Sequence, residues 1–217
     1  VIRGLYGNRI LVLLSGARFD NQQWQDEHGL GLSQIGIDRV ELIKGPSSLL
    51  YGSDAMGGVI NIIEEKPETL GVKYDAGTQI YTNTGGTLSD IGFAKKTVKN
   101  WFRIRIGIEN HADYSDGNGA RVLNSRNQGY YLKAGYGFEK KNWKQENSYN
   151  FSINQFGFIL EDTGFTADNR WSRAMDGPHH IVILNLLNSQ NTFYLKQSVL
   201  KLNAGLQSNS RREDEGG

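Results

Sequence analysis

The sequence of 217 residues contains no cysteine and only three prolines. The absence of cysteine excludes disulfide bonds and cysteine-ligated metal sites, and it is compatible with any cellular compartment. The 24 basic and 23 acidic residues almost balance, with a net charge of +1, so the charge gives no reason to expect a nucleic-acid partner. No run approaches the roughly 18 consecutive apolar residues that a membrane-spanning helix needs.

Low hydropathy does not by itself exclude a membrane protein. The mean hydropathy is −0.50, but the strands of a membrane barrel face lipid only at alternate residues, so such chains have ordinary overall hydropathy. Glycine is abundant, with 27 residues, or about 12% against roughly 7% in average proteins. The sequence also begins at Val1 without a methionine or an apolar signal region, so we expect a longer precursor.

The most informative segment is 39–63, RVELIKGPSSLLYGSDAMGGVINII. Its first residues alternate as in a strand, and Gly45-Pro46 ends that strand because proline has no N–H for a β-ladder and restricts the residue before it. Residues 47–51 are long enough for about one helical turn, with Gly52 at the left-handed position that follows such a turn. The run 59–63 then has the β-branched composition of a buried strand.

This segment resembles the plug-domain signature of TonB-dependent outer-membrane receptors. The order of its pieces carries the likeness: a strand with acidic and basic residues, KGP, LYG, a Gly-Gly pair and VINII. Upstream, Ile2-Arg3-Gly4 and the segment 9–16, RILVLLSG, resemble two further elements of the family, with Ser15 where aspartate is usual. The signature residues implied by the resemblance are Arg3, Gly4, Arg39, Glu41, Lys44, Gly45, Pro46, Tyr51, Gly52, Gly57 and Gly58.

Two other interpretations of this segment are weaker. A phosphate-binding loop around Lys44 would need glycines before the lysine, and none are present. A piece of an ordinary α/β domain disagrees with the sequence that follows Pro67. There, alternating strands predominate, the clearest being 102–109, with apolar residues on one face and charged residues on the other. Three charges on one face suit a water-filled lumen.

The pattern predicts about seven strands after the linker, beginning near Val72, Thr87, Trp101, Gly129, Trp143, Ile181 and Val199. Short connections alternate with the long polar segments 112–128 and 154–179, as on the two ends of outer-membrane barrels. Aromatic residues near strand ends suit interface girdles, with simple packing as the alternative role for any single one of them, namely Trp101, Tyr130, Tyr131, Trp143 and Tyr149.

We therefore predict a mainly β fold. The resemblance implies a small mixed α/β plug domain with an about four-stranded sheet over residues 1–66. Residues 67–217 would form the first antiparallel strands of a large transmembrane β-barrel, incomplete in this chain because family barrels have about 22 strands.

The resemblance also implies a function: active import of a scarce ligand, such as a ferric siderophore, haem or cobalamin, in the outer membrane of a Gram-negative bacterium. The implied partners are that ligand, outer-membrane lipid and the inner-membrane TonB complex, which would act through a segment before Val1. The alternatives are import of an oligosaccharide, where relatives usually read KDA in place of Lys44-Gly45-Pro46, or a non-transporting barrel such as an adhesin. We expect no enzyme activity and no cofactor, since the four histidines have no spaced nucleophile partner.

Two sets of site residues follow. The polar segment after residue 16 offers flat aromatic faces and neutral hydrogen-bonding groups, and we predict ligand contacts there from Phe19, Gln22, Gln23, Trp24 and His28. A merely solvated loop is the alternative, and adjacent Asp26, Glu27 and His28 do not make a convincing metal site. By resemblance, Arg3 and Lys44 would pair with acidic residues of the barrel wall beyond Gly217 and hold the plug in place.

Overall fold

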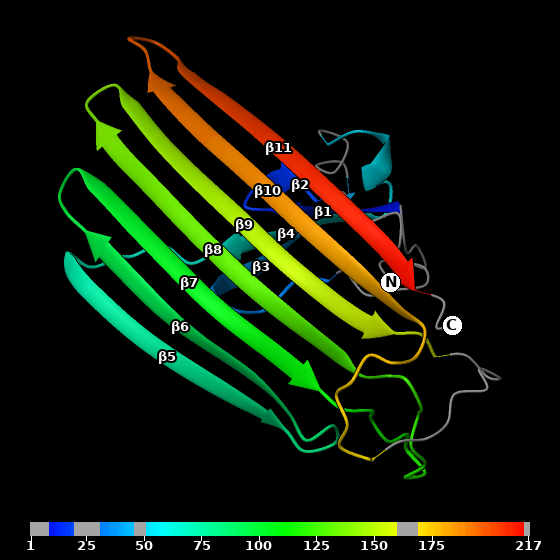
Figure 1. Ribbon diagram of the computed structural model, residues 1–217. Helices are drawn as coiled ribbons and strands as arrows, with labels where there is room; N and C mark the ends of the chain where they lie inside the picture. The colour runs from blue at the N-terminus through cyan, green and yellow to red at the C-terminus, as the bar shows by residue number, and fades with distance from the viewer. Residues whose placement is uncertain (1–8, 20–30, 46–50, 160–168, 215–217) are drawn as a thin grey trace.

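The computed structural model describes residues 9–19, 31–45, 51–159 and 169–214. In these ranges the chain forms two β-sheets, a small one and a large one (Figure 1). No helix among the described residues has the length and apolar character needed to cross a membrane. The predicted mainly β fold is confirmed.

The small sheet has four strands in the order β2-β1-β4-β3. Its strands are β1 (Ile10–Leu14), β2 (Ala17–Arg18), β3 (Ile37–Ile43) and β4 (Gly58–Glu64). Strand β1 runs parallel to β4, whereas β2 and β3 are antiparallel to their neighbours. All five residues of β1 are buried, which explains why its sequence is a continuous apolar run rather than an alternating one.

Signature glycines of this sheet are required by the backbone conformation. Gly45 and Gly52 have φ angles of 78° and 90°, which side-chain-bearing residues rarely adopt. A Cβ atom at either position would have nothing within 4 Å, so the constraint is conformational and not steric. Gly52 directly precedes the one-turn 3₁₀ helix η4 (Ser53–Ala55). The helical turn predicted over 47–51 lies almost entirely outside the described residues.

The large sheet has seven antiparallel strands that follow one another in sequence order. They are β5 (Gly71–Tyr81), β6 (Gly86–Lys96), β7 (Asn100–His111), β8 (Asn127–Lys140), β9 (Trp143–Gly157), β10 (His179–Tyr194) and β11 (Val199–Asp214). Each begins within two residues of its predicted start. In the described structure β5 and β11 are the free edges of the sheet.

The connections separate the two ends of the large sheet. The turns 97–99, 141–142 and 195–198 lie at one end, and the connections 112–126 and 158–178 lie at the other. The predicted alternation of short and long connections thus holds for these strands, with the four-residue turn 82–85 as a short connection at the long-connection end. Figure 1 shows the three short turns together at the upper left.

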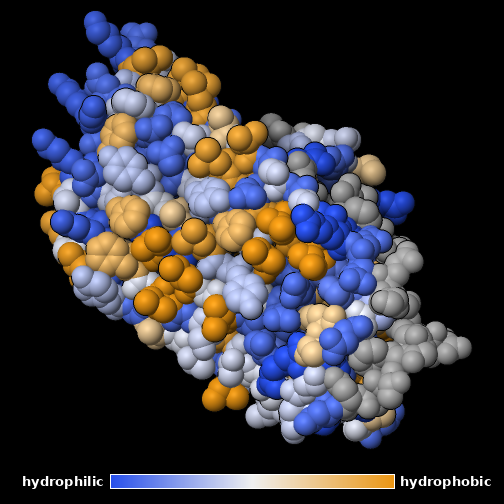
Figure 2. All heavy atoms as spheres, viewed as in Figure 1, coloured by the Kyte–Doolittle hydropathy of each residue, from blue (hydrophilic) through white to orange (hydrophobic). Residues whose placement is uncertain are grey.

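The two faces of the large sheet differ in polarity. The face turned away from the small sheet carries exposed apolar residues, including Ile91, Ile106, Ile108 and Leu206 at 52–71% exposure, and Figure 2 shows this apolar surface. The face turned toward the small sheet, called here the inner face, buries charged side chains instead. Trp101 and Tyr131 belong to this inner face, so their predicted place in an outward aromatic girdle was wrong.

The end with long connections is held together by arginines. Asp113 is completely buried, and its carboxylate accepts hydrogen bonds from Arg121 Nη2 at 2.8 Å and from Arg126 Nη2 at 3.0 Å. Arg126 also donates to the carbonyl oxygen of Ala174 at 2.7 Å. Burial alone would raise the pKa of Asp113, but the hydrogen bonds from Arg126 and Arg121 outweigh it and lower that pKa below its ordinary value.

Candidate functional site

The small sheet contacts the inner face of the large sheet through buried charges, and Glu64 is at the centre of this contact. Glu64 ends β4 and is 2% exposed. Its Oε2 atom lies 3.1 Å from Arg103 Nη2 on β7, and it accepts a hydrogen bond from Asn150 Nδ2 on β9 at 3.3 Å. Since three strands of two sheets meet at one carboxylate, this residue links the sheets directly.

Lys133 on β8 adds a second connection to the same place. Its Nζ atom lies 3.9 Å from Glu64 Oε1 and donates a hydrogen bond to the carbonyl oxygen of Ile35 at 2.8 Å. The lysine side chain is itself buried. Lys133 therefore fixes both the end of β4 and the segment that leads into β3.

Arg105, two residues after Arg103 on the inner face, forms ion pairs with three carboxylates. It lies 2.7 Å from Glu65 Oε1 of the linker and 2.5 Å from Asp75 Oδ2 of β5, and it also contacts Asp90 of β6. Gly92 makes room for it, since a Cβ there would come within 2.6 Å of the guanidinium. Glu64 and Glu65 thus bind adjacent inward arginines of one strand.

The turn between β1 and β2 docks on the inner face through its carbonyl groups. Ser15 and Gly16 have φ angles of 48° and 79°, as in the type I′ turns that join tight hairpins, so the turn forms although serine replaces the usual aspartate. Asn188 Nδ2 donates to the Ser15 carbonyl at 2.9 Å, and Asn203 Nδ2 donates to the Gly16 carbonyl at 3.0 Å. The amide side chains of β10 and β11 therefore satisfy a turn that would otherwise be buried with unpaired groups.

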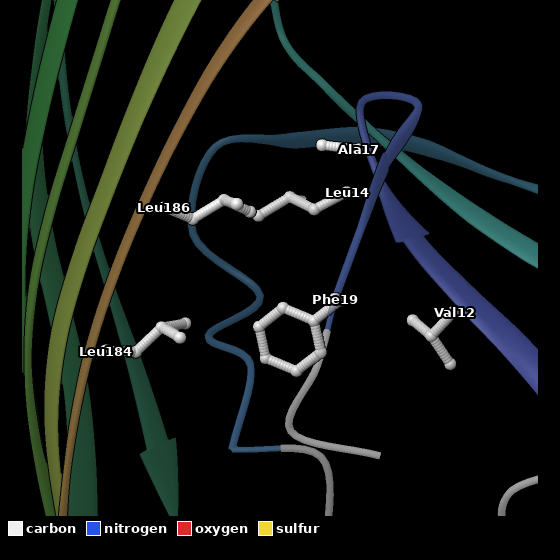
Figure 3. Close-up of a cluster of buried hydrophobic side chains, with 6 residues drawn as sticks. All are labelled: Val12, Leu14, Ala17, Phe19, Leu184 and Leu186. Atoms are coloured by element: carbon white, nitrogen blue, oxygen red, sulfur yellow. The ribbon is translucent and has the colours of Figure 1, made fainter. Parts of the chain in front are cut away.

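A small apolar cluster completes the contact. Leu184 and Leu186 on β10 pack against Val12, Leu14, Ala17 and Phe19 of the small sheet and the segment after it. In Figure 3, Leu14 and Leu186 point toward each other, and the ring of Phe19 lies between Leu184 and Val12. Phe19 is 0% exposed, so it does not present the exposed aromatic face that the ligand-contact prediction assumed. Its position gives it a packing role instead.

The other predicted site residues are distributed as follows. Arg39 forms an exposed ion pair with Glu41 at 2.9 Å, within β3 itself. Lys44 and Tyr51 are exposed, and Gly57 donates its N–H to the carbonyl oxygen of Arg9 at 2.7 Å. The predicted residues that lie outside the described part of the chain are Arg3, Gly4, Gln22, Gln23, Trp24, His28 and Pro46.

The observed contact is a different one from the predicted pairs of Arg3 and Lys44, which stay a prediction because their partners would lie beyond Gly217. We expected basic residues of the small sheet to bind acidic residues of the wall, whereas here carboxylates at the end of the small sheet bind inward arginines and a lysine of the wall. The sequence pattern places the charged residues of 102–109, Arg103 and Arg105 among them, on a lumen-facing side but indicates no partner for them. The sequence signal that could have identified these partners is the pair Glu64-Glu65, which directly follows an apolar strand.

Comparison with known proteins agrees with this architecture. Residues 1–59 match the family model described as TonB-dependent Receptor Plug Domain. The chain is 45% identical over 74 residues to the iron-regulated outer membrane virulence protein of Vibrio cholerae serotype O1, covering 31% of this chain and 11% of that relative. It is 34% identical over 105 residues to the vitamin B12 transporter BtuB of Photobacterium profundum, covering 45% and 17%. The chain therefore spans less than a fifth of these relatives.

Solved structures extend the similarity beyond the plug. The ferric yersiniabactin uptake receptor FyuA of Yersinia pestis superposes with a TM-score of 0.72 at 13% identity, over 100% of this chain and 34% of that receptor. The siderophore receptor PirA of Pseudomonas aeruginosa gives 0.70 at 14% identity, over 99% and 35%. At such low identity these matches show the fold alone.

A small sheet seated on a wall of antiparallel strands is thus the architecture that this chain shares with the solved receptors named above, and its relatives place it in the outer membrane. Residues 1–59 carry the sequence of a TonB-dependent receptor plug domain, and the chain as a whole is similar to TonB-dependent receptors. From here on, the small sheet is called the plug and the large sheet the wall.

Proposed function

We propose that this chain supplies the plug and the first part of the wall of a receptor that actively imports a scarce ligand across the outer membrane. A ferric siderophore, haem or cobalamin is the favoured class of ligand. The observation that carries the proposal is the buried attachment of the plug to the inner face through Glu64, Arg103 and Lys133. A barrel that only adheres or only supports the membrane has no need of an internal domain held in this way.

The chemistry of the attachment suits a plug that must move. Among the described residues, Glu64 Oε1 and Arg103 Nε and Nη1 are buried without a hydrogen bond. Buried polar groups that are only partly paired stabilise a contact less than fully paired ones do. The surrounding contacts are mostly hydrogen bonds to amide side chains, which water can replace as the plug shifts. We infer that Glu64 and Glu65 hold the plug closed and that ligand binding weakens this hold.

The proposal includes the domain division at residue 66, with 1–66 as the plug and 67–217 as the wall. It also includes an inner-membrane TonB complex as the source of energy. The predicted pairs of Arg3 and Lys44 with acidic wall residues are kept as a second attachment of the plug, separate from the one at Glu64.

Ligand contact is proposed for Gln22, Gln23, Trp24 and His28, in the segment that follows Phe19. The test is ligand affinity of the full-length receptor carrying Trp24→Ala, with Trp143→Ala as the control. Trp143 stacks on Phe193 at 5.8 Å on the outer face of the wall, which is turned away from the plug. A binding tryptophan should contribute roughly 1–3 kcal/mol, or about tenfold to a hundredfold in affinity. Equal affinities of the two variants would remove Trp24 from the site.

The import function is tested with cells that express the full-length receptor as their only receptor of this class. Uptake of radiolabelled ferric siderophores, haem and cyanocobalamin is measured with and without a working TonB complex. We expect TonB-dependent uptake of one of these ligands. Uptake only of an oligosaccharide would move the receptor to the glycan branch, and surface attachment without any uptake would favour the adhesin.

A further inference from the structure

The short-turn end of the wall carries positive charge on its outward side. Lysines there occupy the turns or outward-facing strand ends, and all are exposed: Lys95, Lys99, Lys140, Lys141 and Lys196, called here the rim lysines. The outward direction of Lys95 follows from its pairing opposite Phe102, and that of Lys140 from its pairing opposite Trp143. Neither aspartate nor glutamate occurs in residues 95–100, 140–143 or 194–199.

Several lysines on the inward side of the same rim make specific contacts by contrast. Lys66 pairs with Glu146 at 2.6 Å, and Lys144 lies 3.2 Å from the same residue. Lys96, which is adjacent to Lys95 but points inward, donates to the carbonyl oxygen of Glu68 at 2.9 Å. These three inward lysines are therefore engaged in contacts on the plug side, whereas the rim lysines point to the side that the plug does not contact.

Aromatic and apolar side chains accompany the rim lysines. Phe138 and Trp143 meet edge to face at 4.7 Å on the outer face, and Lys140 Nζ lies 5.3 Å from the Phe138 ring centre. At the turn tips, Val98 is 85% exposed and Leu195 is 57% exposed. Figure 2 shows hydrophilic side chains projecting at the upper left, beyond the apolar surface.

This order of side chains matches the layers of a membrane interface. Apolar residues suit the hydrocarbon, aromatic rings suit the headgroup level, and lysines extend their charged ends beyond it. An anionic phosphate is the group that such lysines attract at a lipid surface. An acidic protein is a poorer fit, because the lysines are spread over three successive turns around the rim and alternate with exposed apolar tips instead of forming one compact patch.

We propose that the rim lysines bind the phosphate groups of anionic phospholipids in the leaflet that surrounds the short turns. The proposal rests on the outer-membrane orientation of the wall, in which short turns face the periplasm, and not on the identity of the imported ligand. It gives the wall a lipid preference at one end, which would fix its depth and tilt while the plug moves.

The test uses the full-length receptor in phosphatidylcholine bilayers that contain traces of spin-labelled phosphatidylglycerol or spin-labelled phosphatidylcholine. Electron spin resonance then gives the relative association of the two lipids with the protein. We expect phosphatidylglycerol to be preferred, with Lys140→Gln/Lys141→Gln reducing that preference by up to about fivefold for each lysine, and less at high salt. Replacing all rim lysines by glutamine should bring the ratio to about one.

The matched control is Lys73→Gln/Lys201→Gln, which removes the same charge from the inward face of β5 and β11 and should leave the preference unchanged. An equal loss in both double variants, or no preference in the unmodified receptor, would overturn the proposal. The proposal would also be overturned if the rim variant kept its preference for phosphatidylglycerol but lost the binding of a periplasmic protein. Ligand uptake is measured separately, so a failure of import leaves the lipid result intact and interpretable.

Discussion

The two faces of the wall differ in a way that reverses the arrangement of a water-soluble sheet. On β7, Arg103 and Arg105 point inward and are 3% and 6% exposed, whereas Ile106 and Ile108 point outward and are more than half exposed. A soluble protein would bury the isoleucines and expose the arginines. The difference shows that the polar environment of this wall lies on the plug side and the apolar environment lies outside, as in a barrel immersed in lipid.

The same comparison applies within one strand of the wall. On β10, Leu184 and Leu186 point inward and pack onto the plug. Asn188, two residues after Leu186, points to the same face and donates a hydrogen bond to the Ser15 carbonyl. The inner face is thus matched to the plug residue by residue, while the outer face needs only to be apolar.

The largest expected effect comes from leaving inner-face charges without a partner. Glu64→Leu would leave Arg103 and Lys133 buried without the carboxylate that they share. Removing one partner of a buried ion pair typically costs about 3–5 kcal/mol of stability. We expect the amides of β1 and β4 to lose protection from hydrogen exchange in the full-length receptor. Glu41→Leu is the control on the same plug sheet, because Glu41 forms an ion pair only with exposed Arg39 among the described residues and a hydrogen bond with Asn61, and such surface ion pairs contribute at most about 1 kcal/mol. Equal protection in the two variants would remove Glu64 from the attachment.

A charge on the outer face should be the next most damaging change. Ile106→Arg places a guanidinium near the middle of the lipid-facing surface, at an expected cost of about 2–4 kcal/mol in equilibrium unfolding from bilayers. Thr87→Arg adds the same group on the same face near a strand end, where the cost falls to about 0–1 kcal/mol. If the two variants unfold alike, the outward face of this wall is not in contact with lipid.

Neighbouring leucines on opposite faces sharpen the comparison further. Leu186→Ala removes a side chain that is 2% exposed and packed on Leu14, and we expect a loss of about 2–3 kcal/mol in plug attachment, in the lower part of the range for buried leucines. Leu187→Ala should have little effect on the plug, because Leu187 is 49% exposed on the outer face. Hydrogen exchange of β1 measures both, and matching losses would contradict the assignment of faces.

Much of this fold could be predicted from the sequence, because strand alternation is a local property. The alternation through Phe102 and Ile104 fixes the outward face of β7, and by the same rule it points Trp101 inward, so the error at Trp101 was avoidable. The attachment at Glu64 could not be predicted in this way. It joins residues 39 positions apart and depends on how the plug is rotated within the wall, which no local pattern records.

Phe19 illustrates the same limit. It precedes a polar segment and looks exposed in the sequence, yet its backbone N–H donates to the Val12 carbonyl at 3.0 Å. That hydrogen bond continues the β1–β2 pairing and turns the ring onto Leu184. The two leucines that cover Phe19 belong to a strand more than 160 residues later. Their contact with Phe19 depends on how the plug packs on the wall, which the local sequence does not show.

The smallest expected effect concerns the end of the wall with long connections, where Asp113 binds Arg121 and Arg126. Because its pKa is lowered in the folded protein, this carboxylate stabilises the connections above its ordinary pKa of 3.8, and that stabilisation is lost as the pH falls below it. We expect pepsin to cleave the segment 112–126 of the full-length receptor faster as the pH is lowered from 4 toward 2, after correction for the activity of pepsin on an unfolded substrate.

The Asp113→Asn variant tests whether this pH dependence comes from Asp113. Asparagine cannot lose a proton, so the variant should be cleaved readily at every pH and should show no additional increase as the pH falls. Asp116→Asn is the matched control, because the Asp116 carboxylate accepts hydrogen bonds from the N–H groups of Asn118 and Ala120 in its own exposed turn. It should keep the pH dependence of the unmodified receptor. If the pH dependence persists in Asp113→Asn, it comes from other carboxylates. The pair of Asp113 with Arg126 then does not hold these connections in place.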